Sequence, residues 1–120
     1  MAKPLVIIVE DHQDHVTILE SAFSMAGFET EVIGDGAVAR DRLKEVVPAV
    51  VVLDLNLPKV SGEELLYQIR LDDRLADVKV LVSTADQALA DELQISPDLI
   101  LIKPCSFVHL RSLAEEYYPK

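Results

Sequence analysis

The chain has 120 residues, half of them hydrophobic, which is enough for one domain built on a single core. Its 21 acidic and 11 basic residues give a formal charge of −10, which argues against direct binding of nucleic acid or of an anionic membrane surface. The one cysteine, Cys105, cannot form an intramolecular disulfide, and the apolar run 5–9 is too short for a signal or membrane segment. We therefore expect one domain over residues 1–120, located in the reducing cytoplasm.

The first half of the chain alternates between strand and helix patterns. It predicts a buried strand at 5–9, a helix, an edge strand at 28–33, a helix at about 37–46 and a central strand at 49–53. Asp14 is placed to cap the first helix, and Gly27 is a natural stop for it. Pro48 ends the second helix. The run 49–53 is the most apolar of all, which puts it in the middle of the sheet.

The second half continues the alternation. It predicts a helix from about Ser61, a strand at 78–83, a short helix at 85–93, a strand at 98–102 and a last helix capped by Ser106. Glu63 and Glu64 suit the positive end of the third helix. Five strands alternating with five helices indicate an α/β fold, in which right-handed crossovers cover both faces of a parallel sheet with helices.

Polar residues follow the strands of this expected sheet at their carboxyl ends. These residues are Glu10, Asp11, Asp54, Ser83, Thr84 and Lys103. Open parallel sheets bind ligands outside the carboxyl ends of their strands, so residues far apart in the chain are expected to meet in one crevice. This convergence is the strongest functional signal in the sequence.

The acids in that crevice need a partner of opposite charge. Two carboxylates about 4 Å apart repel by roughly 4 kcal/mol at an effective dielectric constant of about 20. Glu10, Asp11 and Asp54 offer hard oxygen ligands, which suit Mg²⁺ better than zinc. Lys103 and the Thr84 hydroxyl would complete a phosphate clamp around Asp54. The expected chemistry is a carboxylate nucleophile that forms an acyl phosphate.

These residues resemble the response-regulator receiver domain of two-component signalling, and the resemblance runs from the first strand to the last helix. Glu10 and Asp11 match the acidic pair for Mg²⁺, and Asp54 matches the aspartate phosphorylated by a histidine kinase or phosphotransfer protein. The stretch "DLNLPKVSGEELL", residues 54–66, is similar to the family's loop and third helix in its Pro58 and Gly62. Other matching positions are Asn56, whose carbonyl would bind the metal, Thr84, which would bind the phosphoryl group, and Lys103-Pro104.

The resemblance implies a flavodoxin-like three-layer sandwich with strand order 2-1-3-4-5, and commonly a cis bond between Lys103 and Pro104. It also implies a phosphoacceptor that catalyses only its own phosphorylation and dephosphorylation, and that signals to an output protein through protein contacts. The last helix reaches Tyr118, so we expect no output domain within these 120 residues. The sequence identifies neither the kinase nor the output protein.

Two alternatives and one departure remain. A hydrolase of the haloacid dehalogenase kind is disfavoured because its nucleophile follows the first strand, and a degenerate receiver that only binds partners is disfavoured because Asp54 and its neighbours are present. Ile100 replaces the aromatic residue that the family usually has three positions before its lysine. His12 and His15 are expected to form the solvated start of the first helix, and Asp35 a simple turn.

Overall fold

The computed structural model describes residues 2–57 and 59–120. Five parallel strands form one sheet in the order β2-β1-β3-β4-β5. Their bounds are β1 Leu5–Val9, β2 Glu29–Ile33, β3 Val50–Asp54, β4 Lys79–Thr84 and β5 Leu99–Ile102. The fold class and the strand order implied by the resemblance are therefore confirmed, with β2 at one edge and β3 at the centre.

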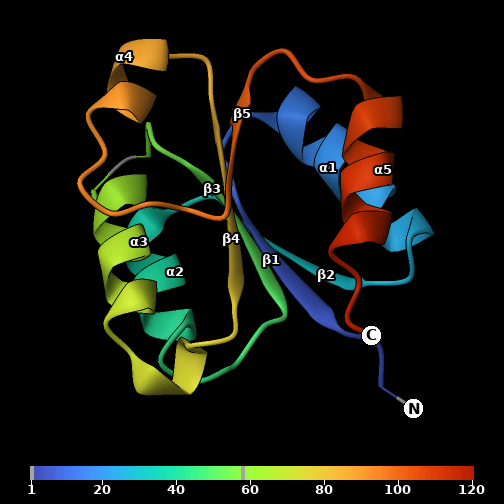
Figure 1. Cartoon of the computed structure of the whole chain (residues 1–120), viewed down its shortest axis with the longest axis horizontal. Helices are drawn as coiled ribbons and strands as arrows, with labels where there is room; N and C mark the ends of the chain where they lie inside the picture. Colours follow the sequence, from blue (N-terminus) through green and yellow to red (C-terminus); the bar gives the residue numbers. More distant parts are fainter. Residues whose placement is uncertain (1, 58) are drawn as a thin grey trace.

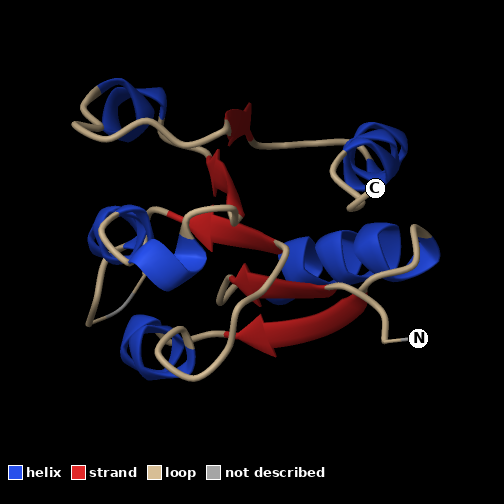
Figure 2. Cartoon of the chain, turned by 60° about the horizontal axis from the view of Figure 1, so that its bottom comes forward, coloured by secondary structure: helices blue, strands red, loops and turns tan. Residues whose placement is uncertain are grey.

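Helices cover both faces of the sheet. The helices are α1 Gln13–Met25, α2 Gly36–Arg42, α3 Gly62–Arg70, α4 Gln87–Asp91 and α5 Phe107–Glu116, and a 3-10 turn, η1, spans Asp73–Leu75. Helices α1 and α5 lie side by side on one face, and α2, α3 and α4 lie on the other (Figures 1 and 2). In the described part of the chain, no helix has the length and apolar character needed to cross a membrane.

The central strand explains why the layers hold together. All five residues of β3 are buried. Because side chains alternate across a strand, Val51 and Leu53 join the core under α3, whereas Val50 and Val52 join the core under α1 and α5. Full burial of such side chains contributes about 1.5–3 kcal/mol each, so β3 fixes both layers at once. Asp54 is thereby held at the end of a strand that is buried along its whole length.

Two local predictions were wrong. The first helix begins at Gln13 with His12 at its N-cap, so Asp14 lies in the first turn and caps nothing. Its charge still suits that turn, because the N-terminal end of a helix is positive. Helix α2 ends at Arg42, before Val46, because the amide groups that follow bond at mixed spacings: Glu45 N–H donates to Arg42 O. Gly27, in contrast, has a φ of 104°, as expected for a helix stop.

Asp98 ties the edge strand β5 to the rest of the sheet. Its Oδ2 accepts hydrogen bonds from the backbone N–H of Val80 at 2.7 Å and from the guanidinium of Arg70 on α3 at 2.9 Å. Burial alone would raise the pKa of Asp98, but these two donors outweigh burial and lower the pKa below its ordinary 3.8. The carboxylate form is therefore the one that the fold stabilises.

Asp98→Ala is expected to lower the free energy of unfolding by about 2 kcal/mol at pH 7, because two charge-assisted bonds to Asp98 disappear. A group with a lowered folded pKa stabilises above its unfolded pKa and loses that contribution as the pH falls. The difference from wild type should therefore shrink below about pH 4. Urea unfolding at pH 7 and pH 3 measures it. Asp77→Ala, at an exposed site before β4, is the control.

Candidate functional site

The site residues are positioned by extensions of the sheet beyond the strand ends. Glu10 directly follows β1, and its N–H donates to Ile33 O at 3.1 Å. Asp54 is the last residue of β3 and lies in register with Ser83. Lys103 follows β5, and its N–H donates to Thr84 O at 2.8 Å. Strand pairing, rather than loop conformation, therefore brings these side chains to one edge.

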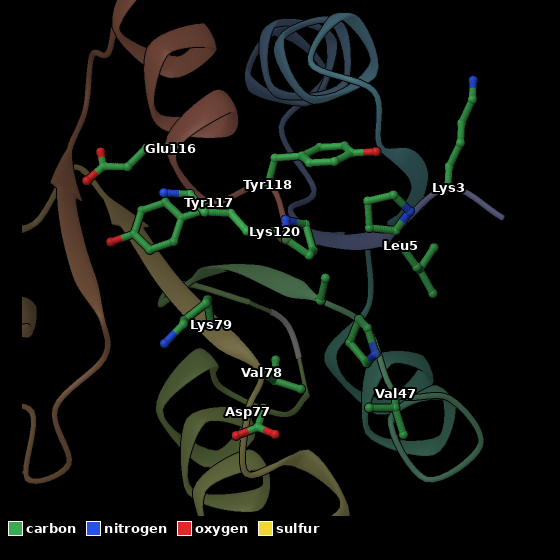
Figure 3. A pocket seen from close by; sticks show the side chains of 14 residues that line it. Lys3, Leu5, Val47, Asp77, Val78, Lys79, Glu116, Tyr117, Tyr118 and Lys120 are labelled. Carbon is green, nitrogen blue, oxygen red and sulfur yellow. The ribbon is translucent and has the colours of Figure 1, made fainter. Parts of the chain in front are cut away.

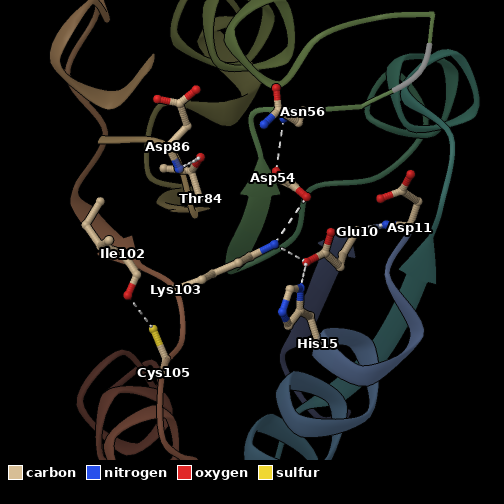
Figure 4. A network of polar contacts seen from close by, with 10 residues as sticks. All are labelled: Glu10, Asp11, His15, Asp54, Asn56, Thr84, Asp86, Ile102, Lys103 and Cys105. Atoms are coloured by element: carbon tan, nitrogen blue, oxygen red, sulfur yellow. Dashed lines mark hydrogen bonds and ion pairs between the residues drawn. The ribbon is translucent and has the colours of Figure 1, made fainter. Parts of the chain in front are cut away.

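Lys103 joins the two buried acids. Its Nζ donates to Oε1 of Glu10 and, at 3.2 Å, to Oδ2 of Asp54 (Figure 4). Glu10 is 2% exposed and Asp54 8% exposed, so these ion pairs are largely shielded from water. Replacing Lys103 would leave both carboxylates buried without their counter-charge, which is costly. The ammonium group and both carboxylates therefore behave as one unit.

The pKa values of the two acids move in opposite directions. Burial raises the pKa of Glu10 to about 7, with a further contribution from the neighbouring Asp54. Burial would also raise the pKa of Asp54, but hydrogen bonds from Glu10 and from the N–H of Asn56, together with Lys103, lower it. At neutral pH Asp54 is therefore a carboxylate, while Glu10 lies near its midpoint. A second positive charge in the crevice would favour ionisation of both acids.

Asp11 completes a group of three acids. One carboxylate oxygen from each of Glu10, Asp11 and Asp54 can lie within 4.8 Å of the others, which is close enough to hold one cation. Asp11 is exposed, so the group opens to solvent on its side, and its N–H donates to Oε2 of Glu10 at 3.2 Å. Three hard oxygen donors with one open side fit Mg²⁺, which keeps several of its waters.

Asn56 follows β3 and Thr84 is the last residue of β4, so both lie at the same edge of the sheet as the acids. The N–H of Asn56 donates to Oδ1 of Asp54 at 3.0 Å, and its side chain is exposed. Thr84 is fully buried, and its hydroxyl oxygen accepts the N–H of Asp86 at 3.1 Å (Figure 4). The Thr84 hydroxyl keeps its hydrogen for another acceptor. The bond between Lys103 and Pro104 is cis, as the resemblance implied.

The loop from Asp54 to α3 packs closely against its neighbours. A Cβ atom on Gly62 would lie 2.2 Å from the backbone oxygen of Asp54, so the start of α3 sits directly beside the candidate phosphoacceptor. Lys59, at a φ of 67°, pairs with Asp35 at 3.1 Å, and Asp35 also caps α2. Asp35 is thus more than the simple turn expected. Pro58, which was expected to shape this loop, lies outside the described residues.

His15 is a site contact that the sequence did not indicate. Its Nδ1 lies 3.0 Å from Oε1 of Glu10 (Figure 4). The expected solvated position holds for His12, which is exposed, but only in part for His15, whose side chain is 33% exposed. The sequence signal that could have indicated this contact is the position of His15 relative to the apolar residues of the first helix. His15 precedes Ile18 and Leu19, which pack toward the core, by one helical turn, so it lies on the side of α1 that faces the sheet.

A wide groove of about 790 Å³ lies at the opposite end of the molecule (Figure 3). Its walls come from the amino ends of β1 and β4 and from the C-terminal segment, and they include Leu5, Val78, Tyr117 and Lys120. Within the described residues, acids close enough to share a cation occur only at the carboxyl ends of the strands. The groove is therefore separate from the chemistry described above.

Known sequences match the chain over most of its length. The profile of the response regulator receiver domain matches residues 6–115. The probable methanogenesis regulatory protein FilR2 of Methanothrix harundinacea is 37% identical, over 93% of this chain and 79% of FilR2. The transcriptional regulatory protein PrrA of Mycobacterium tuberculosis is 33% identical over 87% of this chain. The alignment covers only 45% of PrrA, so this chain corresponds to less than half of that protein.

Solved structures agree with the fold. The receiver domain of the sensor histidine kinase PA1611 of Pseudomonas aeruginosa, crystallised with magnesium in its active-site cleft, superposes with a TM-score of 0.84 at 22% identity. That match covers 97% of this chain and 98% of the other. The bacteriophytochrome response regulator RtBRR gives a TM-score of 0.74 at 31% identity, over 98% of this chain and 78% of RtBRR. The chain belongs to the response regulator receiver domain family of two-component signalling.

Proposed function

We propose that residues 1–120 form a single phosphoacceptor receiver domain, in which Asp54 takes a phosphoryl group from a histidine kinase or a histidine phosphotransfer protein. One observation carries the proposal. The Asp54 carboxylate is held at the end of the central strand, ionised and largely buried, between the ammonium of Lys103 and two further acids. A fixed carboxylate in a crevice that already pairs opposite charges suits nucleophilic attack on phosphorus.

Mg²⁺ is the cofactor that fits this crevice. Glu10, Asp11 and Asp54 would hold it with their carboxylates, and Asn56 with its backbone carbonyl. The support is the donor set itself: three hard oxygens within reach of one ion, one of which belongs to an acid whose pKa is raised to about 7 by burial and by its acidic neighbour. When bound, Mg²⁺ neutralises the negative charge on the phosphoryl oxygens during transfer.

Side chains of the domain itself carry out the phosphoryl transfer. An oxygen of Asp54 forms the new P–O bond while the P–N bond of the donor phosphohistidine breaks, and the leaving nitrogen keeps the electron pair and takes up a proton. Lys103, which contacts Oδ2 of Asp54, balances the charge of the phosphoryl group. The Thr84 hydroxyl donates its free hydrogen to a phosphoryl oxygen. The product is an acyl phosphate.

The phosphorylated domain signals through protein contacts. Its partners are the kinase or phosphotransfer protein and an output protein, and it acts in the cytoplasm without binding nucleic acid or membrane directly. The formal charge of −10 supports this partner class, because it repels polyanions and favours basic protein surfaces. The domain is not an enzyme with an external substrate, since it catalyses only its own phosphorylation and dephosphorylation.

Incubation with Mg²⁺ and acetyl phosphate, or with beryllofluoride, tests the proposal. Intact-mass spectrometry should detect one phosphoryl group on wild type and none on Asp54→Ala, whereas Asp91→Ala, changed at an exposed site on α4, should behave as wild type. Continuous release of phosphate from a second phosphorylated substrate, over many turnovers, would instead indicate a hydrolase. Absence of any adduct on wild type would support a degenerate receiver that binds partners independently of phosphorylation.

A further inference from the structure

Glu10 is held by two donors at one oxygen. Its Oε1 contacts both Nζ of Lys103 and, at 3.0 Å, Nδ1 of His15. Its Oε2 is held separately by the N–H of Asp11 at 3.2 Å. Lys103 is shared, because the same Nζ also contacts Asp54. A lysine that must serve a phosphoryl group on Asp54 cannot serve Glu10 equally well at the same time. Among the described residues, in contrast, Glu10 is the one acid that pairs with His15.

The imidazole of His15 is well placed to be a lasting donor. It stands on the first turn of α1, and this helix is anchored by the buried side chains of Val16 and Leu19. Its ring stacks on that of His12 with centroids 4.4 Å apart and an interplanar angle of 28°. Packing of the helix and stacking of the ring both restrict the rotamers of His15, so little conformational entropy is lost when the bond to Glu10 forms.

The direction of the bond follows from the other partner. Oε1 of Glu10 accepts from the ammonium of Lys103, which can only donate. In its carboxylate form Glu10 has no hydrogen to donate, so the same oxygen accepts from His15 and Nδ1 carries the hydrogen. This arrangement requires no charge on the imidazole, because a neutral ring with its hydrogen on Nδ1 is a donor there.

We infer that His15 is a positioning residue for Glu10. Its Nδ1–H keeps the Glu10 carboxylate in place beside Asp11 and Asp54 while Lys103 turns to the phosphoryl group on Asp54. The inference rests on the proposed phosphorylation of Asp54 and deepens it. Residues that orient metal-binding groups typically affect metal affinity by about 10–100-fold. His15 thus adds to the acid group a contact from α1, an element that supplies none of the expected ligands.

The test compares a substitution of His15 that keeps a hydrogen-bond donor with substitutions that remove it. In His15→Asn the amide Nδ2 takes the place of Nδ1, whereas His15→Leu and His15→Ala have no donor. Calorimetric titration with MgCl₂ alone should give a Kd about tenfold weaker for the Leu and Ala variants. The Asn variant should remain within about threefold of wild type, because the donor is kept. His109→Leu, on the exposed side of α5, is the matched control and should bind as wild type.

A second readout does not depend on the metal. The Asp11 amide donates to Oε2 of Glu10, so its NMR chemical shift in the magnesium-free protein reports the orientation of that carboxylate. The shift should move in the Leu and Ala variants and return in the Asn variant. Unchanged Mg²⁺ affinity in both donor-free variants, or failure of Asn to restore it, would overturn the inference. If wild type itself forms no beryllofluoride adduct, the proposed function fails instead, and the inference with it.

Discussion

Glu10→Gln is expected to stabilise the magnesium-free protein at pH 7.5 by up to about 3 kcal/mol and to remove most of its response to Mg²⁺. The first effect comes from burial, which with help from Asp54 raises the pKa of Glu10 from 4.5 to about 7. Each unit of difference between folded and unfolded pKa values corresponds to about 1.4 kcal/mol. Glutamine resembles the protonated acid, so the variant avoids the cost of a buried charge.

The pH dependence of this effect has a definite sign. The folded state holds the proton of Glu10 until about pH 7, whereas the unfolded state releases it near pH 4.5. The contribution of Glu10 to stability is therefore fully present below pH 4.5 and is lost as the pH rises to about 7. Wild type in EDTA should lose stability across this window, and the Glu10→Gln variant should show a flatter profile. Urea unfolding at pH 5, 6 and 7.5 measures the difference.

Magnesium should remove most of the difference in stability between the two proteins. A ligand at about a hundredfold excess over its Kd stabilises the folded state by about 2.7 kcal/mol, and this gain requires an ionised Glu10. Wild type should gain it at pH 7.5, and the Glu10→Gln variant should gain little. Glu29→Gln, at an exposed position on the edge strand β2, controls for loss of one negative charge. Equal pH profiles for wild type and the Glu10→Gln variant would contradict the assigned protonation of Glu10.

Gly62→Ala is expected to destabilise the fold by about 3 kcal/mol or more and to reduce phosphorylation sharply. The added Cβ would lie 2.2 Å from the backbone oxygen of Asp54 and 2.8 Å from Cα of Leu55. Both contacts are with backbone, so no side chain can rotate away, and overpacking of this kind costs about 1–3 kcal/mol or more. The chain must move α3 away from β3 or displace Asp54 itself.

Gly34→Ala is the matched control for that substitution. Its added Cβ would have its nearest neighbour at 3.7 Å, the backbone oxygen of Glu10, which is ordinary contact. Its stability should change by less than about 1 kcal/mol, because the contact is relaxed and the stiffer unfolded chain favours folding slightly. Thermal unfolding and the acetyl phosphate reaction should be measured on both proteins. Wild-type behaviour of the Gly62→Ala variant in both assays would show that the loop yields more easily than its packing indicates.

The sheet and its polar tips could be predicted from the sequence because their signals are local. An apolar run such as 50–53, with three β-branched valines, predicts a buried strand without any knowledge of its neighbours. The parallel order then places the residue after each strand at the same edge, so Glu10, Asp54 and Lys103 could be expected to meet. Their contacts through Lys103 agree with that expectation.

The wrong predictions concern features that depend on tertiary packing. Asp14 has the right chemistry for a cap, but α1 starts at Gln13, so His12 takes the N-cap position without a side-chain bond. The bond between His15 and Glu10 depends on the angle at which α1 leaves β1, which is set by buried contacts such as that of Phe23 with Phe28. Ile100 shows another limit: its identity could be read from the sequence, but its 38% exposure depends on how the neighbouring elements pack on β5.

The position of Lys103 also affects how a newly synthesised chain folds. Its ammonium is a tethered counter-ion, delivered to Glu10 and Asp54 by the chain itself when β5 pairs with β4. Its local concentration therefore depends neither on dilution nor on the ionic composition of the cell. A newly synthesised chain can assemble its acidic crevice before any divalent cation arrives, and a chelator should remove signalling competence while the folded state persists.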